Sequence, residues 1–436
     1  EMVHVAKEME RQGFEIPLLI GGATTSKVHT AVKIEPQYHG ATIYVVDASR
    51  AVGVAENLLS AERKQAYIAD IKTDYNTIRE KRASNQKVKK TATLTQAREN
   101  RWTTHWADYQ PTKPRVLEHN NPQMLDDYFT VEHKNGGIIL QANDYPLADL
   151  MERIDWTPFF RSWELAGFYP AILEDEVVGE EATKLFKDAQ TMLTQLVDEQ
   201  WLTARAVLGL FPANSQGDDI VLYQDETRDK ITMTLHHLRQ QMARNKQQAN
   251  YCLSDFIAPE DSGKADWLGA FAVTTGIGIA EHIAAFKAQY DDYQVILLEA
   301  LADRLAEALA ERMHEKMRKV FWAYAEDEQL DNQAIIKEKY HGIRPAPGYP
   351  ACPDHTEKAK LWSLLEPDTR IDLHLTESFA MLPAAAVSGW YFSHPNARYF
   401  GTGKIQKDQV EDYAKRKGWS LDEAEKWLMP VLAYDS

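Results

Sequence analysis

Short apolar runs alternate with helical patterns in the first sixty residues. Apolar positions recur at helical spacing over residues 2–9. Compact apolar runs at 16–20 and 41–47 predict two buried strands, and residues 49–59 predict a helix after the second strand. Alternation of this kind is typical of a doubly wound, Rossmann-like parallel sheet. Because such a sheet needs more strands before these two, we expect a truncated α/β domain and a chain that is a fragment.

The pattern changes after a charged stretch at residues 60–82. Residues 83–97 lack helical periodicity and are rich in Lys, Thr, Gln and Ser, which indicates a domain boundary. Hairpin-like strands and separate helices follow, so we expect a larger α+β domain with a mainly antiparallel sheet. Its helices are expected at 181–199, 293–322, 407–417 and 421–428, and its strands at 207–212, 220–223, 231–235, 385–393 and 398–406. The predicted organisation is an α/β part at 1–69, a linker at 70–97 and the α+β domain at 98–436.

Composition excludes several classes of protein. The net charge of −16 over 436 residues argues against general attraction to nucleic acid. No apolar run approaches the roughly 20 residues of a membrane span, and the first residues show no secretory signal. The two cysteines, Cys252 and Cys352, form neither a CxxC motif nor a Cys/His cluster. We therefore expect free thiols in a cytoplasmic protein and no metal site in this chain.

Basic residues gather around the expected linker despite the negative net charge. They are Arg79, Lys81, Arg82, Lys87, Lys89, Lys90, Arg98 and Arg101. A solvated linker is the simpler interpretation, and a docking strip for an acidic partner is the alternative.

A glycine- and hydroxyl-rich turn follows the first expected strand. It reads Gly21, Gly22, Ala23, Thr24, Thr25 and Ser26. Two glycines let a backbone approach a ligand closely, and free amides at a helix start suit a polar or anionic group. An ordinary strand-to-helix turn explains the same residues equally well.

A proline-rich segment at residues 344–353 is the second candidate site. Four prolines in ten residues restrict its backbone, and Gly348 is its flexible point. Arg344 on such a loop could bind a carboxylate through two parallel hydrogen bonds, and Tyr349 could lie over a flat ligand. A surface loop with a structural arginine is the alternative, but the length and rigidity of the segment favour binding.

Acidic and aromatic positions provide further candidates. Asp155 lies among aromatic residues, where it could bind a ligand or cap a helix. Asp303 and Glu307 share one helix face and, with Glu338, could surround a cation. Neighbouring charges make a solvated helix face the simpler interpretation of that pair. The aromatic residues at 388–400 could stack a base, although core packing is the default.

Together these segments resemble the cobalamin-dependent methionine synthases. The resemblance spans nearly the whole chain except about residues 100–150. It is carried by IPLLIGGATTSK, IDWTPFF, EDEVVG, LFPAN, DDI, NYCLSDF, SGKADWLGAF, LADRLAEA, GIRPAPGYPACPDHTEK, LTESFAM and VSGWYFSHP.

The resemblance implies a reactivation module. In this family a methyl group passes from methyltetrahydrofolate through cobalamin to homocysteine, and occasional oxidation leaves inert cob(II)alamin. Reactivation couples reduction by flavodoxin, or an equivalent reductase, to methyl transfer from S-adenosylmethionine. The full-length enzyme would be a methyltransferase of methionine biosynthesis, and this chain would hold the end of its cobalamin domain and its S-adenosylmethionine domain.

The resemblance also implies roles for individual residues. Arg344 would hold the methionine carboxylate. The S-adenosylmethionine contacts are expected at Asp155, Asp303, Arg344, Tyr399 and Phe400. Positioning, rather than acid–base catalysis, is expected of Glu307, Glu338 and Tyr349, with Tyr349 facing the corrin. The wall around the cobalamin tail is expected at Gly21, Gly22, Thr24 and Ala48.

One departure from the family is the lack of the DxHxxG motif that carries the lower axial histidine. The homocysteine, folate and zinc modules are also absent, so this chain alone should not make methionine and its cobalamin site should be incomplete. We expect a monomer that works with a reductase and the enzyme's other domains, without nucleic acid or membrane. Two alternatives are an ordinary S-adenosylmethionine methyltransferase and a non-catalytic docking module for a reductase.

Overall fold

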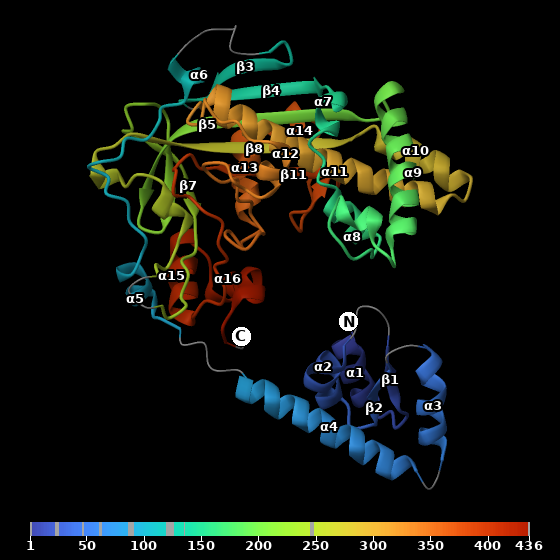
Figure 1. Ribbon diagram of the computed structural model, residues 1–436. Coiled ribbons are helices and arrows are strands. Elements are labelled where there is room, and N and C mark those ends of the chain that lie inside the picture. The colour runs from blue at the N-terminus through green and yellow to red at the C-terminus, as the bar shows by residue number, and fades with distance from the viewer. Residues whose placement is uncertain are drawn as a thin grey trace. The chain divides into compact units, whose positions relative to one another are not determined.

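The computed structural model describes residues 2–21, 26–45, 48–60, 63–85, 91–118, 126–134, 136–244 and 248–434. The chain divides into two compact units, Glu1–Lys90 and Thr91–Ser436 (Figure 1). The expected linker at 70–97 is helical through Asn85, and the second unit begins before residue 98.

The first unit is built on a two-stranded parallel sheet. Strand β1 (Leu18–Ile20) pairs in parallel with β2 (Thr42–Tyr44), which confirms the expected α/β pattern. Its helices are α1 (Met2–Arg11), α2 (Lys27–His29), α3 (Ala48–Leu59) and α4 (Lys64–Asn85). Parallel strands require a crossover, and the helical segments between β1 and β2 provide it. The Tyr75 hydroxyl on α4 accepts a hydrogen bond of 2.8 Å from the Tyr44 amide, which ties α4 to β2.

A seven-stranded antiparallel sheet forms the centre of the second unit. Its path runs β11-β8-β5-β4-β3, and β6 and β7 branch from β5. The strands are β3 (Phe129–Lys134), β4 (Gly137–Tyr145), β5 (Thr203–Gln216), β6 (Asp219–Tyr223), β7 (Ile231–His236), β8 (Asp266–Ile277) and β11 (Ala386–Tyr391). A separate small hairpin joins β9 (His374–Leu375) and β10 (Met381–Leu382). The antiparallel pairing confirms the expected sheet, although β3, β4 and β8 have no counterpart among the predicted strands.

Both faces of this sheet are covered, which explains the apolar character of its central strands. Successive strand residues point to opposite faces, so Leu208 and Phe271 join one core while Val207 and Ala270 join the other. The helices of the second unit are α5 (Leu94–Glu99), α6 (Arg115–Glu118), α7 (Leu147–Met151), α8 (Trp156–Ser162), α9 (Gly179–Asp198), α10 (Ile279–Ala288), α11 (Asp292–Lys316), α12 (Asn332–Ile336), α13 (Glu357–Leu365), α14 (Pro367–Arg370), α15 (Lys407–Lys417) and α16 (Leu421–Leu428). The long helix α11 packs on the first face and α13 on the second (Figure 1).

One predicted strand is wrong. Residues 398–406 form no strand, and their only described ladder contact is a single bridge from Ile405 to Leu432. The segment instead follows the edge of the second core, where Phe400 packs. Within the described ranges, no helix is both long enough and apolar enough to span a bilayer.

Candidate functional site

A cavity of about 480 Å³ lies beside α11 in the second unit. Residues from α11, the proline-rich segment, β11 and the segment after β11 line it. Among them are the candidates Glu307, Glu338, Arg344, Tyr349, Tyr399 and Phe400. The fold therefore brings together residues that are separated by up to ninety-three positions in the sequence, since 400 − 307 = 93.

The proline-rich segment is held against β11 by backbone hydrogen bonds. Ile343 exchanges hydrogen bonds of 3.1 and 3.0 Å with Phe392, and the Pro345 carbonyl accepts one of 2.9 Å from Trp390. A Cβ at Gly389 would lie 2.6 Å from the Pro345 oxygen, so only glycine permits this approach. The loop that carries Arg344 is thus fixed to the sheet rather than free at the surface.

Arg344 has both a partner and spare donors. Its side chain is 18% exposed, and Nη2 donates a hydrogen bond of 2.8 Å to Oε2 of Glu311. Nη1 is 3.9 Å from Glu307, and the buried Nε has no hydrogen-bond partner among the described residues. Burial tends to lower the pKa of Arg344, but Glu311 and the nearby tyrosines raise it well above the usual value. A permanently charged guanidinium with unused donors can bind an incoming carboxylate.

Aromatic side chains form another part of the cavity wall. The Tyr399 hydroxyl accepts a hydrogen bond of 3.0 Å from the Arg344 amide and lies 3.2 Å from the Tyr340 hydroxyl. Burial raises the pKa of Tyr399, which keeps its hydroxyl neutral. Tyr349 is 61% exposed and so offers a ring face to a ligand or to another surface.

Two carboxylates also line the cavity. Glu307 projects from α11 with 38% of its side chain exposed. Glu338 follows α12 with a φ of 53°, a left-handed conformation that a non-glycine residue adopts only when its surroundings hold it. Partial burial of its carboxyl raises the pKa of Glu338. Carboxylates and a guanidinium in the same cavity suit a zwitterionic ligand.

Two expected contacts lie outside the lining of this cavity. Asp155 is the N-cap of α8, where Oδ1 accepts a hydrogen bond of 3.0 Å from the Thr157 amide, which confirms the helix-cap interpretation. Asp303, one turn before Glu307, lines a separate, mainly apolar cavity of about 720 Å³ beside β8, α10 and β10.

The expected cobalamin residues lie in the first unit. Gly21 follows β1, and a Cβ there would lie 3.1 Å from the Val45 carbonyl oxygen, so tight strand packing already explains this glycine. Gly22 and Thr24 fall outside the described residues. Ala48 begins α3.

Glu311 is a residue of this site that the sequence did not single out. Its charge beside Glu307 was consistent with a solvated helix face, yet its side chain is only 12% exposed and pairs with Arg344. Sequence spacing could have identified Glu311 as a candidate, because Glu307 and Glu311 are four residues apart and share a helix face.

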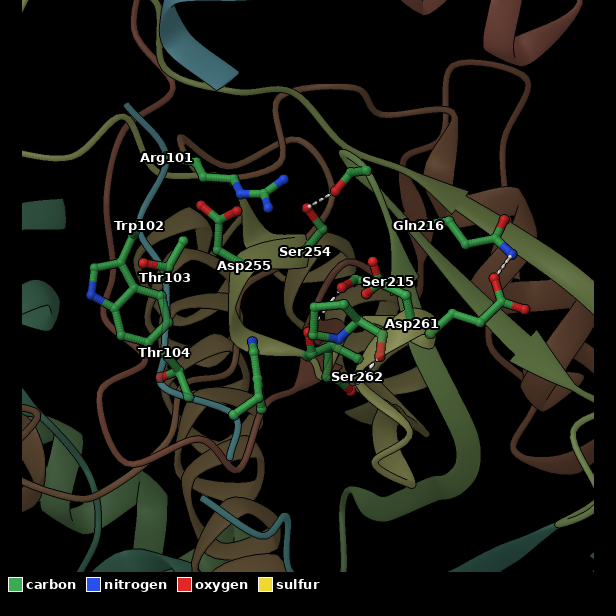
Figure 2. A pocket seen from close by; sticks show the side chains of 15 residues that line it. Arg101, Trp102, Thr103, Thr104, Ser215, Gln216, Ser254, Asp255, Asp261 and Ser262 are labelled. Atoms are coloured by element: carbon green, nitrogen blue, oxygen red, sulfur yellow. Dashed lines mark hydrogen bonds between the residues drawn. The ribbon is translucent and has the colours of Figure 1, made fainter. Parts of the chain in front are cut away.

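A second polar cavity of about 480 Å³ lies between residues 101–106, the end of β5 and residues 254–262 (Figure 2). Several of its polar groups are bound to the protein itself. Ser215 and Ser254 donate to main-chain carbonyls at 2.9 and 3.0 Å, and both oxygens of Asp255 accept hydrogen bonds from Arg239. Over the described part of the chain, no cluster of three His, Cys, Asp or Glu side chains is arranged to hold a metal ion.

Comparisons with known proteins bear directly on the Arg344 cavity. Residues 146–418 match the model of a family described as "Vitamin B12 dependent methionine synthase, activation domain". This range includes all the cavity-lining residues. The chain is also similar to a solved structure described as "Crystal Structure of the MetH Reactivation Domain bound to AdoHcy". The two share 53% sequence identity and a TM-score of 0.72, and the match covers 79% of this chain and 99% of the other.

Proposed function

Because this chain belongs to the family of vitamin B12-dependent methionine synthase activation domains, we propose that its Arg344 cavity binds S-adenosylmethionine for the reductive remethylation of cobalamin. The observation that carries the proposal is the largely buried guanidinium of Arg344, which lines the cavity and has an unpartnered buried Nε. The similar reactivation domain is described as bound to AdoHcy, the demethylated form of that ligand, which supports the same assignment here.

The amino-acid end of the ligand accounts for the charged part of the cavity. Arg344 would bind the α-carboxylate, because its fork geometry matches two carboxylate oxygens. Glu307 and Glu338 would lie near the positive ammonium and sulfonium groups, which a carboxylate stabilises. A volume of about 480 Å³ falls within the usual range for pockets that hold ligands of this size.

The nucleoside end would use the aromatic residues. Tyr399 and Phe400 would pack against the adenosine, and the exposed ring of Tyr349 would face the corrin. When bound, cobalamin supplies the cobalt that accepts the methyl group, and the residues described here bind and orient the methyl donor. Asp155 and Asp303 would act at most from the edge of the site, since neither lines the cavity in this structure.

The wider role extends beyond this chain. We propose that it acts within a cytoplasmic methyltransferase that makes methionine and that flavodoxin, or an equivalent reductase, supplies the electron. The basic residues near the linker are not all available for such a partner. Arg79 pairs with Glu35 at 2.6 Å, and Arg98 pairs with Asp218 and Asp412 at 2.8 Å.

Binding of S-adenosylhomocysteine, measured by calorimetry, tests the proposal. The wild type should bind, and Arg344→Ala should bind at least about a hundredfold more weakly, because a charge-assisted bidentate contact contributes roughly 3 kcal/mol. Arg161→Ala is the matched control, because Arg161 lies on α8 against Phe168 and does not line the cavity. Equal affinity of the wild type and Arg344→Ala would refute the assignment of the site.

A further inference from the structure

Glu311 lies behind the Arg344 guanidinium rather than in the cavity itself. Its Oε2 accepts a hydrogen bond of 2.8 Å from Nη2 of Arg344, and its side chain is only 12% exposed. Glu311 is absent from the residues that line the cavity, so it would reach a ligand only through Arg344.

A buried row of alternating charges supports Glu311 from the other side. Oε1 of Glu311 lies 3.7 Å from Nη1 of Arg318, a fully buried residue in the π-helical turn Met317–Phe321. Arg318 in turn donates to Glu328 through Nε at 2.9 Å. The row Glu328–Arg318–Glu311–Arg344 gives each buried charge an opposite neighbour, as low-dielectric surroundings require.

The aromatic residues connect this row to the cavity wall. The Arg318 guanidinium lies 4.5 Å from the ring centre of Tyr340. The Tyr340 hydroxyl is 3.2 Å from the hydroxyl of Tyr399, which accepts a hydrogen bond from the Arg344 amide. Both the backbone and the side chain of Arg344 are therefore held by groups that are themselves fixed.

Two acids on the same helix compete for the Arg344 guanidinium. Glu307 faces the cavity at 3.9 Å from Nη1, and Glu311 binds Nη2 from behind at 2.8 Å. Glu311 is the more buried of the two, so its attraction to the guanidinium is less screened by water. If Glu311 were absent, the Arg344 guanidinium could turn towards Glu307 and pair with it. Neither the guanidinium nor the Glu307 carboxylate would then be free to bind a ligand.

We propose that Glu311 is a positioning residue that holds Arg344 back from Glu307, so that both remain available to the carboxylate and the ammonium of the bound amino acid. This inference rests on the proposed function, because it assigns a role at the same S-adenosylmethionine site. The effect of Glu311 should therefore be confined to ligands that carry the amino-acid end.

Two probes separate positioning from a general structural role. S-adenosylhomocysteine carries the amino-acid end, whereas methylthioadenosine keeps the nucleoside and the sulfur without it. Glu311→Gln should weaken binding of S-adenosylhomocysteine at least about tenfold, which corresponds to about 1.4 kcal/mol. Its binding of methylthioadenosine, followed by ligand-observed NMR to millimolar concentration, should change less than about twofold, by roughly 0.4 kcal/mol or less.

The chain offers a matched control on the same helix. Glu315 lies one turn after Glu311 and pairs with Arg153 and Arg312 at 2.8 Å, but it does not line the cavity. Glu315→Gln should leave the binding of both probes unchanged. Glu311→Asp keeps the charge but withdraws the carboxylate by one methylene, so it should also weaken S-adenosylhomocysteine selectively; it carries the test if Glu311→Gln does not fold.

The possible outcomes distinguish the two proposals. Equal weakening of both probes by Glu311→Gln, or no weakening of either, overturns the positioning role. Failure of the wild type to bind S-adenosylhomocysteine overturns the proposed function itself. Selective loss of S-adenosylhomocysteine binding in the Glu311 variants, with Glu315→Gln unchanged, supports the positioning role.

Discussion

Two largely buried arginines of the second unit show how differently the same side chain can be used. Arg239 is 1% exposed, and all three of its side-chain nitrogens have partners. Nε donates to Asp218 at 2.7 Å, Nη1 to the Asn250 carbonyl at 2.8 Å, and Nη2 to Asp255 at 2.7 Å. Arg344 instead has one close partner, Glu311, and a buried Nε without one.

The difference separates a structural arginine from a binding one. Both side chains are charged and both pair with acids, so charge pairing does not distinguish them. Position and spare donors together do. Arg344 lines its cavity and keeps a donor without a partner, whereas Arg239 is outside the cavity lining and all its nitrogens are bound; a buried polar group without a partner costs free energy that a ligand in contact with it can recover. We therefore expect Arg239 to control folding and Arg344 to control binding.

The largest effect should come from Arg239→Ala. This change leaves Asp255 and Asp218 buried with less compensation, so we expect the free energy of unfolding to fall by about 3–5 kcal/mol. Urea denaturation measures it. Arg344→Ala should destabilise the fold much less, although it weakens binding at least about a hundredfold. If Arg344→Ala were the more destabilising of the two, the contrast between structural and binding arginines would be wrong.

A smaller effect should follow from Tyr399→Phe, which keeps the aromatic ring and removes the hydroxyl that accepts a hydrogen bond from the Arg344 amide. Loss of one such bond should weaken binding of S-adenosylhomocysteine by about 1 kcal/mol, or roughly fivefold. Calorimetry on the variant and the wild type measures this change. Unchanged affinity would show that the ring alone is needed and that the backbone of Arg344 is held by other contacts.

The last prediction concerns the buried His394 and the dependence of stability on pH. Both ring nitrogens of His394 are occupied, since Nε2 lies 2.9 Å from the Thr104 hydroxyl and Nδ1 accepts from the Asn396 amide at 3.1 Å. Protonation of the ring would put a hydrogen on Nδ1, so that two N–H groups would face each other where the Asn396 amide now donates a hydrogen bond. Burial lowers the pKa of His394 to about 4.

The sign of the pH effect follows from this shift. Between about pH 6.5 and pH 4 the unfolded chain holds a proton on this histidine that the folded chain lacks, so acidification favours unfolding. His394→Gln should therefore flatten the dependence of the unfolding free energy on pH in this window. His105→Gln is the control, because the His105 side chain is 85% exposed. If the unfolding free energy of His394→Gln depended on pH as steeply as that of the wild type, His394 would not be the source of this pH dependence.

Much of the fold could be predicted from periodicity. The helices α9, α11, α15 and α16 appear where apolar spacing places them, and β6 and β7 form the expected hairpin. Strand β8 was missed because it is buried on both faces and therefore lacks alternation. The expected strand at 398–406 is wrong because its apolar residues do not cover a sheet face. Tyr399 and Phe400 line the Arg344 cavity instead, and Phe400 also packs at the edge of the second core.

The sequence by itself determined the family resemblance, the parallel and antiparallel parts, and the candidacy of Arg344 on a stiff loop. Only the tertiary structure decided which acidic residues lie beside Arg344. Asp303, Glu307 and Glu311 follow one another on the same helix, yet one lines a neighbouring cavity, one the Arg344 cavity, and one is buried behind it. Their helical spacing is the same, but their environments depend on segments that pack against α11 from distant parts of the chain, and spacing along a helix carries no information about those.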